Sequence, residues 1–377
     1  MWLWYNQKNT RKKILKFLFN FSLHLLQDTL FISKVYKLFV RLLYIMKLLI
    51  TGGAGFIGSN FIKYLFKKYN DVSVINLDVL NYSGREENLE EINGSPNYRF
   101  VRGDICDVDK LEDLIGDFDV IVNFAAETHV DRSFTGPLKF INPNIMGVTK
   151  LLEFSRKKKT NLFLQISTDE VYGDVINGFA NEDSILSPNN PYAASKAAAE
   201  MMVKSYMKTY KVPAIITRSC NNYGPNQYPE KIVPFFIIQA LNNKNLPLHG
   251  DGSNIRDWLF VQDNCEAMDL IINKGKIMET YNIAGNDERT NLEIAKFLLN
   301  KLGKPLDLIN LVEDRPWNDV RYASDVSKVR ELGWEPKYDF NRGIDITLDW
   351  YKSHHSEMKK LLKLDSHHPM INYIKQL

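Results

Sequence analysis

Cysteine is scarce in this sequence, and its three residues are far apart. Cys106, Cys220 and Cys265 form no C-x-x-C pair and have no histidines at ligand spacing. This pattern argues against a disulfide framework and a structural zinc site. We therefore expect no metal centre and a reducing, cytoplasmic environment.

Long apolar runs are also missing, even from the hydrophobic first 45 residues. Lys16, His24 and Asp28 interrupt the apolar residues there, so no run approaches the roughly 18 residues of a membrane helix. The same interruptions argue against a secretory signal. Two interpretations of residues 1–45 stay open. They form a basic amphipathic segment that lies on a membrane surface, or they precede a true start at Met46, which we favour because a predicted strand follows directly.

A basic surface is lacking as well, although the formal charge of the 377-residue chain is +3. Residues 1–45 hold eight of the 48 Lys and Arg residues and one of the 45 Asp and Glu residues, so residues 46–377 carry a charge of −4. These residues contain no basic stripe of the kind that nucleic-acid binding needs. The 45% of hydrophobic residues can form the core of one large or two modest domains. We expect a globular protein without a nucleic-acid partner.

A glycine-rich turn between a strand and a helix is the first positive signal. Residues 47–51 form a β run, Gly-Gly-Ala-Gly-Phe-Ile-Gly follows at residues 52–58, and residues 59–69 have helical periodicity. A second strand, residues 72–78, ends in an acid at the spacing of a dinucleotide fingerprint, which makes an ordinary tight turn the weaker interpretation. The glycines let the backbone approach a pyrophosphate, and the acid favours the ribose of NAD over the 2′-phosphate of NADP. The predicted NAD-binding residues here are Gly52, Gly55, Phe56, Ile57, Gly58 and Asp78.

Further strands follow at the spacing of an α/β protein. They are predicted at residues 98–102, 119–124, 162–167 and 214–218, mostly separated by helical patterns. The fold class is therefore α/β, with a doubly wound parallel-sheet Rossmann domain. Ligands of such sheets lie beyond the carboxyl ends of the strands. The segments at those ends include the cofactor candidates Asp104, Ile105, Ala125 and Ala126, the substrate candidate Glu127, and residues 167–170.

A helix is predicted to begin after Asn190, a good capping residue, with Pro191 at its first position. Tyr192 and Lys196 are four residues apart and share a face of this helix. A cation beside a phenol favours phenolate, so we expect the pKa of Tyr192 to fall toward neutrality. Tyr192 would then be a base for a sugar hydroxyl, with both residues also beside the cofactor.

Together these motifs resemble the extended short-chain dehydrogenase/reductase superfamily, and Thr168-Asp169-Glu170 is typical of its nucleotide-sugar 4,6-dehydratases. Residues 47 to about 336 resemble the dTDP-glucose 4,6-dehydratases in particular. Supporting stretches lie at residues 125–133, 221–227, 229–234, 249–258, 281–285 and 314–316.

The resemblance implies tightly bound NAD and a role for each reacting residue. Tyr192, supported by Lys196 and Thr168, takes the C4 hydroxyl proton of a hexose as C4 is oxidised. Glu170 is the base for the C5 proton, and Asp169 is the acid for the C6 hydroxyl. A homodimer is also implied, through helices near residues 143–154 and 191–210.

The acid pair carries a geometric condition. Successive residues of a strand point to opposite faces, so both carboxyls reach one sugar only if the chain has left the strand by Asp169. Two adjacent carboxyls also disfavour double ionisation, so we expect one to keep a proton. The alternative is a solvated acidic turn.

After residue 220 the sequence becomes rich in Asn, Gly and Pro, which predicts a loop-built binding surface rather than another sheet unit. We assign a Rossmann domain to residues 46–220, with a return around 259–285. A smaller, mixed C-terminal substrate-binding domain takes residues 221–258 and 286–350, and residues 351–377 are a tail. The predicted substrate-binding residues, some from the resemblance, are Glu127, Thr168, Asn221, Asn222, Lys231, Arg256, Asn291, Arg315 and Asn318.

One departure from the family puts the nucleotide in doubt. Trp317-Asn318 stands where the dTDP-glucose enzymes usually have Gly-His, which makes a UDP-sugar more plausible. The alternatives are therefore UDP-glucose 4,6-dehydratase, a UDP-sugar 4-epimerase or decarboxylase that uses Tyr192 and Lys196 without Asp169, and, least favoured, a non-catalytic NAD-binding protein. His129 lacks a partner for a triad or metal site, and we expect a packing or hydrogen-bonding role.

Overall fold

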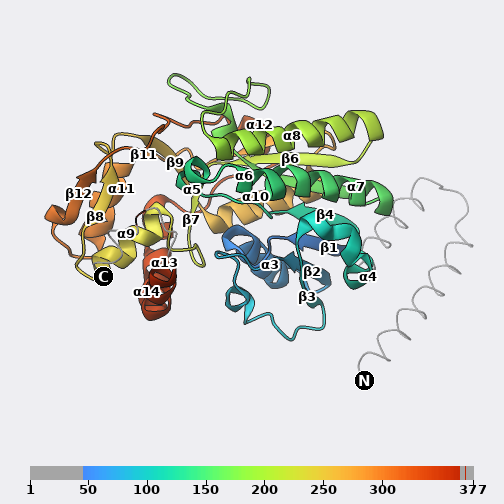
Figure 1. The fold of residues 1–377 in the computed structure, drawn as a ribbon, viewed down its shortest axis with the longest axis horizontal. Helices are drawn as coiled ribbons and strands as arrows, with labels where there is room; N and C mark the ends of the chain where they lie inside the picture. The colour runs from blue at the N-terminus through green and yellow to red at the C-terminus, as the bar shows by residue number, and fades with distance from the viewer. Residues whose placement is uncertain (1–45, 366–369, 371–377) are drawn as a thin grey trace, which may run out of the picture. The chain divides into compact units, whose positions relative to one another are not determined.

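The computed structural model describes residues 46–365 and Met370, so the predicted leader at residues 1–45 lies outside the described residues. A seven-stranded sheet dominates them, in the order β10-β6-β5-β4-β1-β2-β3 with every pair parallel (Figure 1). This confirms the predicted doubly wound α/β fold. The strands are β1 (Met46–Thr51), β2 (Val72–Asp78), β3 (Tyr98–Arg102), β4 (Val120–Asn123), β5 (Leu162–Thr168), β6 (Ala214–Ser219) and β10 (Thr280–Ile283).

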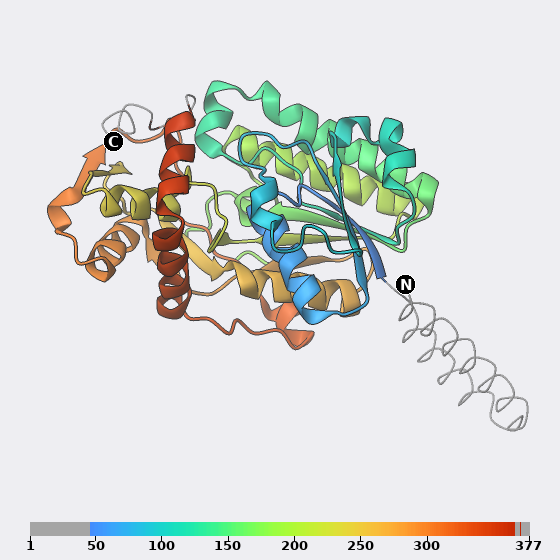
Figure 2. The same cartoon turned by 90° about the horizontal axis from the view of Figure 1, so that it is seen from below.

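Helices cover both faces of this sheet. The apolar faces of α3 and α10 pack on one side through residues such as Phe61 and Met268. On the other side, α7 and α8 pack through Phe154 and Val203. Figure 2 shows the two groups on opposite sides of the strands. The helices of the described residues are α3 (Phe56–Lys68), η1 (Glu86–Leu89), η2 (Ile105–Leu111), α4 (Glu112–Ile115), α5 (Val130–Thr135), α6 (Leu138–Ile141), η3 (Asn142–Gly147), α7 (Val148–Lys158), η4 (Asp169–Tyr172), α8 (Pro191–Tyr210), α9 (Ile232–Leu241), α10 (Val261–Lys274), α11 (Asn291–Lys301), η5 (Leu306–Leu308), α12 (Ser327–Glu331), α13 (Phe340–Ser353) and α14 (His355–Leu364).

The later part of the chain contains two small sheets, so the prediction that it is built of loops rather than sheet is wrong. One sheet is mixed, with the order β11-β9-β7, and the other pairs β12 with β8 in parallel. These strands are short and contain residues that are uncommon in strands, such as Asn221 and Pro247, which concealed them in the sequence. Their bounds are β7 (Asn221–Tyr223), β8 (Leu246–His249), β9 (Ile255–Phe260), β11 (Glu288–Thr290) and β12 (Ile309–Val312).

Helices α9, α11, α13 and α14 surround a second core beside these sheets. The predicted C-terminal tail begins inside α13 and continues as α14, where Met358 and Leu362 are buried in that core. Residues 261–283, where a return was predicted, supply α10 and β10 to the large sheet. Among the described residues, no helix is long and apolar enough to cross a membrane.

Candidate active site

The turn after β1 and the first turn of α3 are shaped so that only glycine fits at one position of each. Gly52 has φ of +69°, and a Cβ there would lie 2.6 Å from the Ala125 amide nitrogen. A Cβ on Gly58 would lie 2.5 Å from the Gly52 carbonyl oxygen. No side chain caps the amino end of α3, which begins at Phe56. Its first amides therefore remain for an anion, and the turn fits a pyrophosphate.

A large cleft of about 510 Å³ opens at this turn, beyond the carboxyl ends of the parallel strands. Asp78 borders it with both carboxylate oxygens engaged, one by the Ala54 amide at 2.9 Å and one by the Leu80 amide at 2.8 Å. Each oxygen has a second lone pair for a ribose hydroxyl. The cleft is lined by every predicted cofactor residue: Gly52, Gly55, Phe56, Ile57, Gly58, Asp78, Asp104, Ile105, Ala125, Ala126, Tyr192 and Lys196.

Helix α8 begins as its sequence predicts. Asn190 caps it by accepting a hydrogen bond from the Ala193 amide at 2.8 Å, and Pro191 takes the first position. The first turns then bring Tyr192 and Lys196 to the large cleft, where both are buried. The Lys196 ammonium donates a hydrogen bond of 2.6 Å to the Ile166 carbonyl oxygen on β5.

The expected fall in the pKa of Tyr192 is wrong for this structure. Burial raises its pKa, and Glu170 and Asp169 raise it further, while a hydrogen bond with Thr168 lowers it by less. Burial also lowers the pKa of Lys196 to about 8, against the raising effect of Glu200. The local helix spacing was correct, but burial and acids from another element raise the pKa, and the hydrogen bond that lowers it comes from Thr168 rather than from Lys196.

The acid pair meets the geometric condition set by its sequence. Strand β5 ends at Thr168, and Asp169 begins the short helix η4, so the strand alternation stops between them. Thr168 caps this turn by accepting from the Glu170 amide at 3.4 Å and donates to the Asp169 carboxyl at 3.3 Å. Both acids border the large cleft.

The two carboxyls have different electrostatic surroundings. Burial raises the pKa of Asp169 well above its usual value, and the acids Glu170 and Asp257 raise it further. Burial also raises the pKa of Glu170, but Lys231 and Arg256 oppose that rise. The protonated form is therefore favoured more at Asp169 than at Glu170.

Asn190 is a site residue that the sequence marked only as a helix cap. While its oxygen caps α8, its amide nitrogen donates to the Glu170 carboxyl at 3.2 Å. This hydrogen bond also lowers the pKa of Glu170. Ser, Thr and Asp cap helices comparably but carry no amide donor, so the second role has no signal in local sequence.

A small cleft of about 140 Å³ adjoins the large one. Both are bordered by Glu170, Asn221, Asn222, Gln227, Glu230 and Lys231. The small cleft alone takes the predicted substrate residues Arg256, Asn291, Arg315 and Asn318, and the large cleft alone takes Glu127 and Thr168. Glu170 thus lies where a cleft suited to a dinucleotide meets one that contains amides and cations, and Asp169 lies beside it in the large cleft.

The cations of the small cleft are held by polar partners. Arg256 donates to the Asn318 side-chain oxygen at 3.1 Å, and its guanidinium lies 4.3 Å from the centre of the Tyr322 ring. Lys231 donates to a backbone carbonyl at 2.9 Å. Arg315 forms an ion pair of 2.6 Å with Asp131, which partly neutralises its positive charge.

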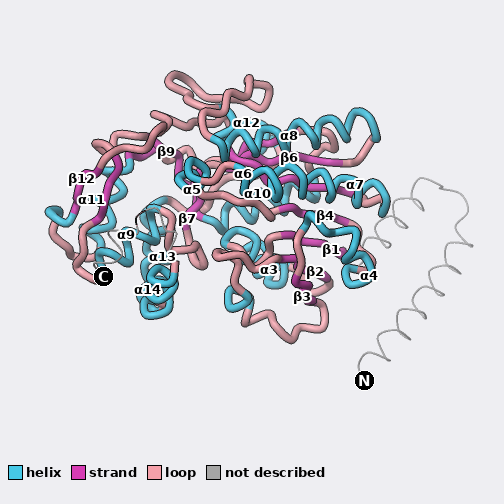
Figure 3. Tube along the Cα trace, in the orientation of Figure 1, coloured by secondary structure: helices cyan, strands magenta, loops and turns pink. Residues whose placement is uncertain are grey.

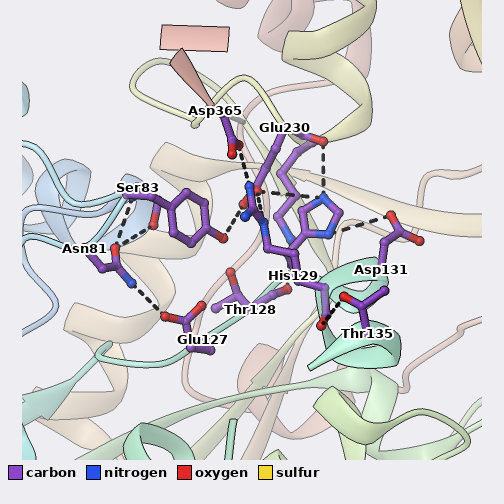
Figure 4. A network of polar contacts seen from close by, with 12 residues as sticks. Asn81, Ser83, Glu127, Thr128, His129, Asp131, Thr135, Glu230 and Asp365 are labelled. Carbon is purple, nitrogen blue, oxygen red and sulfur yellow. Dashed lines mark hydrogen bonds and ion pairs between the residues drawn. The ribbon is translucent and has the colours of Figure 1, made fainter. Parts of the chain in front are cut away.

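His129 lies in a network of polar contacts beside the clefts (Figure 4). Its Nε2 is 3.4 Å from the Glu230 carbonyl oxygen, and its Nδ1 is 3.7 Å from Asp131. Glu230 accepts hydrogen bonds from Tyr82 at 2.8 Å and from Arg132 at 3.0 Å. This agrees with a packing and hydrogen-bonding role, and the described part of the chain holds no cluster of metal ligands.

The raised pKa of Asp169 predicts a pH-dependent stability. The folded chain binds this proton more tightly than the unfolded chain, so its stabilising effect is lost as the pH rises through the folded pKa. Asp169→Asn removes that loss. The free energy of unfolding of this variant, relative to that of wild type, should rise by about 1 to 3 kcal/mol as the pH goes from 5 to 9. A constant difference in thermal scans, matching that of the exposed control Asp113→Asn, would contradict this.

Fold and site together define a dinucleotide-binding enzyme with an acid pair beside its cofactor cleft. The family model described as GDP-mannose 4,6 dehydratase matches residues 49–347. The chain is 49% identical to the low-salt glycan biosynthesis protein Agl12 of Haloferax volcanii, over 81% of this chain and 98% of that protein. It is 42% identical to a dTDP-glucose 4,6-dehydratase of Streptomyces niveus, over 85% and 97% of the two chains.

A solved structure agrees with these relatives. DesIV, a dTDP-glucose 4,6-dehydratase from Streptomyces venezuelae crystallised with NAD and TYD, superposes with a TM-score of 0.82 at 42% identity. The match covers 84% of this chain and all of that one. The chain belongs to the NAD-dependent nucleotide-sugar 4,6-dehydratases of the extended short-chain dehydrogenase/reductase family.

Proposed function

We propose that the chain is a dTDP-glucose 4,6-dehydratase, which converts dTDP-glucose to dTDP-4-keto-6-deoxyglucose and water. The observation that carries this proposal is the asymmetric acid pair, in which Glu170 borders both clefts and Asp169 lies beside it in the large cleft. A 4-epimerase or decarboxylase has no need for a second acid there, whereas elimination of water needs a base and an acid together.

Each reacting residue has its own role in the steps of the proposed reaction. NAD bound in the large cleft would supply the acceptor for the C4 hydride and the source of its return to C6. Tyr192 takes the proton of the C4 hydroxyl, for which its phenolate must form against the effects of burial and of the two acids. The resulting ketone makes the C5 proton acidic. Glu170 removes that proton, the electron pair forms the C5–C6 double bond, and Asp169 gives its proton to the departing C6 hydroxyl, which leaves as water. Glu170 then returns a proton to C5.

The electrostatics of the site support the assignments of the two carboxyls. Burial raises the pKa of both acids, but Lys231 and Arg256 oppose that rise at Glu170 and so favour the ionised form that a base requires. At Asp169 the rise is increased by Glu170 and Asp257, against the effect of Arg256, which leaves the protonated form that an acid requires favoured. Protonation of Asp169 also removes one of the two negative charges that oppose the Tyr192 phenolate.

Two observations bear on which nucleotide the substrate carries, and they favour different nucleotides. The named dehydratase relatives act on dTDP-glucose by their descriptions and are 42% identical over most of the chain. The second candidate, UDP-glucose, is favoured by Trp317 and Asn318, which border the small cleft where the family usually has Gly-His. Asn318 also holds Arg256, so this departure touches a proposed substrate contact.

A direct comparison of substrates tests the proposal. Purified protein is incubated with dTDP-glucose and with UDP-glucose at matched concentrations, and kcat/KM for the 4-keto-6-deoxy product is measured. We expect dTDP-glucose to be the better substrate. A higher kcat/KM with UDP-glucose would show that the proposed nucleotide is wrong. Formation of the 4-epimer without loss of water would show that the proposed reaction is wrong.

We also propose that the enzyme is a homodimer that pairs through α7 and α8, as the family resemblance implies. Exposed apolar residues lie on and beside these helices, among them Met146 and Met201. Sedimentation of the purified chain tests this: the mass of two chains is expected, and the mass of one chain would contradict the proposal.

A further inference from the structure

Arg218 is the largest side chain in the described structure that is fully buried. It lies on β6 between Ser167 of β5 and Asn282 of β10, near the carboxyl end of the sheet. Its guanidinium forms an ion pair with Glu200 of α8, with Nη2 to Oε2 at 2.7 Å and Nε to Oε1 at 3.0 Å. Glu200 is also fully buried and lies one helical turn after Lys196.

The other side of the guanidinium reaches the turn that carries the acid pair. Arg218 Nη1 donates to the Tyr172 hydroxyl at 2.6 Å, and the cation lies 4.7 Å from the centre of that ring. Tyr172 is the last residue of η4, whose first two residues are Asp169 and Glu170. The same nitrogen donates to the Glu182 carbonyl at 3.1 Å, in the loop of residues 173–190 that joins η4 to α8 (Figure 3).

One side chain therefore joins the two segments that hold the reacting groups. The Tyr172 hydroxyl is also fixed on its other side, because it donates to Asn282 on β10 at 2.7 Å. Arg218, Glu200 and Tyr172 border neither cleft. A ligand of either cleft would therefore not touch them, and any influence on the reaction passes through the residues that they hold.

Stability alone is a poor reason for this arrangement. Burying two charges costs desolvation free energy, and an apolar pair of similar volume is often equally or more stable. What the ion pair supplies here is geometry, because a guanidinium offers donors in a rigid fork that a hydrocarbon lacks. The fork fixes α8 and η4 at one separation.

We propose that Arg218 is a positioning residue for the dehydration, which sets the Asp169–Glu170 turn against the Tyr192–Lys196 helix. This inference rests on the proposed function. The two sets of hydrogen bonds made by Arg218 then affect different steps. The bond to Tyr172 (the Tyr172 arm) positions the acids for the elimination of water. The bonds to Glu200 (the Glu200 arm) position α8, which carries the residues for oxidation at C4.

Tyr172→Phe tests the first arm, because it removes one hydroxyl and keeps the ring. Small displacements of reacting groups cost up to about 100-fold in rate, so we expect exchange of the C5 proton and product formation to fall about 10- to 100-fold. The rate of C4 oxidation, read from the absorbance of reduced cofactor in a single turnover, should stay within about twofold, and so should KM. Arg218→Lys, which keeps the charge but loses both arms of the guanidinium, should show the same loss of elimination and should also slow C4 oxidation.

Tyr281→Phe is the matched control. This buried tyrosine also lies at the sheet, on β10, and its hydroxyl accepts a hydrogen bond of 2.9 Å from the Lys276 amide, away from η4. It should lose comparable stability without any change in C5 exchange.

Two results with Tyr172→Phe overturn the positioning role: exchange of C5 as fast as in Tyr281→Phe, or a loss of C4 oxidation equal to the loss of elimination. Tyr172→Phe keeps the test decisive if Arg218→Lys fails to fold. Failure of the proposed function looks different, since wild type itself would then form no 4-keto-6-deoxy product.

Discussion

Glu170→Gln is expected to stop the reaction after oxidation at C4. The amide keeps the shape of the side chain and its hydrogen bond from Asn190, but it cannot take the C5 proton. Loss of a general base costs typically about 100- to 10,000-fold, so kcat should fall by that factor. Reduced cofactor should still appear on mixing with dTDP-glucose, because Tyr192 and Lys196 are intact.

Three measurements on the same sample separate the steps: reduced-cofactor absorbance, exchange of the C5 proton with solvent, and release of the 4-keto product. The control Glu331→Gln changes an exposed acid on α12 and should behave as wild type. If Glu170→Gln retained full turnover, the assignment of the C5 base would be wrong. If it lost oxidation as well, Glu170 would serve the earlier step.

Tyr192→Phe is expected to block the reaction one step earlier. Without the phenol, the base assigned to the C4 hydroxyl proton is lost, and kcat should fall about 100- to 10,000-fold. Neither reduced cofactor nor C5 exchange should appear. Lys196 keeps its hydrogen bond to Ile166, so cofactor binding should persist.

Tyr98→Phe provides the control for a lost tyrosine hydroxyl. Tyr98 lies on β3, and its hydroxyl accepts from Asn76 at 3.0 Å outside both clefts. Its turnover should match wild type. Rapid appearance of reduced cofactor in Tyr192→Phe would contradict the role of Tyr192 and direct attention to another acceptor of the C4 proton.

The large sheet was predictable because its strands are apolar runs that end at polar residues. Residues 72–78 and 98–102 were predicted with the bounds that β2 and β3 have. The start of α8 was equally predictable, because helix capping by asparagine and proline at the first helical position are local sequence preferences. The acid pair was recognisable from its triplet, and the end of β5 at Thr168 supplies the geometry that the triplet required.

The features that escaped prediction depend on contacts between distant segments. The pKa of Tyr192 is set by burial and by acids on η4, neither of which the Tyr-x-x-x-Lys spacing contains. Arg218 was read only as the end of an apolar strand, and its partners come from α8 and η4. A cation inside a buried strand was the available signal, because such a charge requires a partner.

Solvent labelling tests the central claim most directly. Wild-type protein is incubated with dTDP-glucose in D₂O, and the product is examined by mass and by NMR. An internal sequence of oxidation, elimination and return of hydride predicts a 4-keto-6-deoxy sugar with one solvent deuterium at C5 and the original C4 hydrogen at C6. A product without deuterium at C5, or one that retains the C6 oxygen, would contradict the dehydratase mechanism.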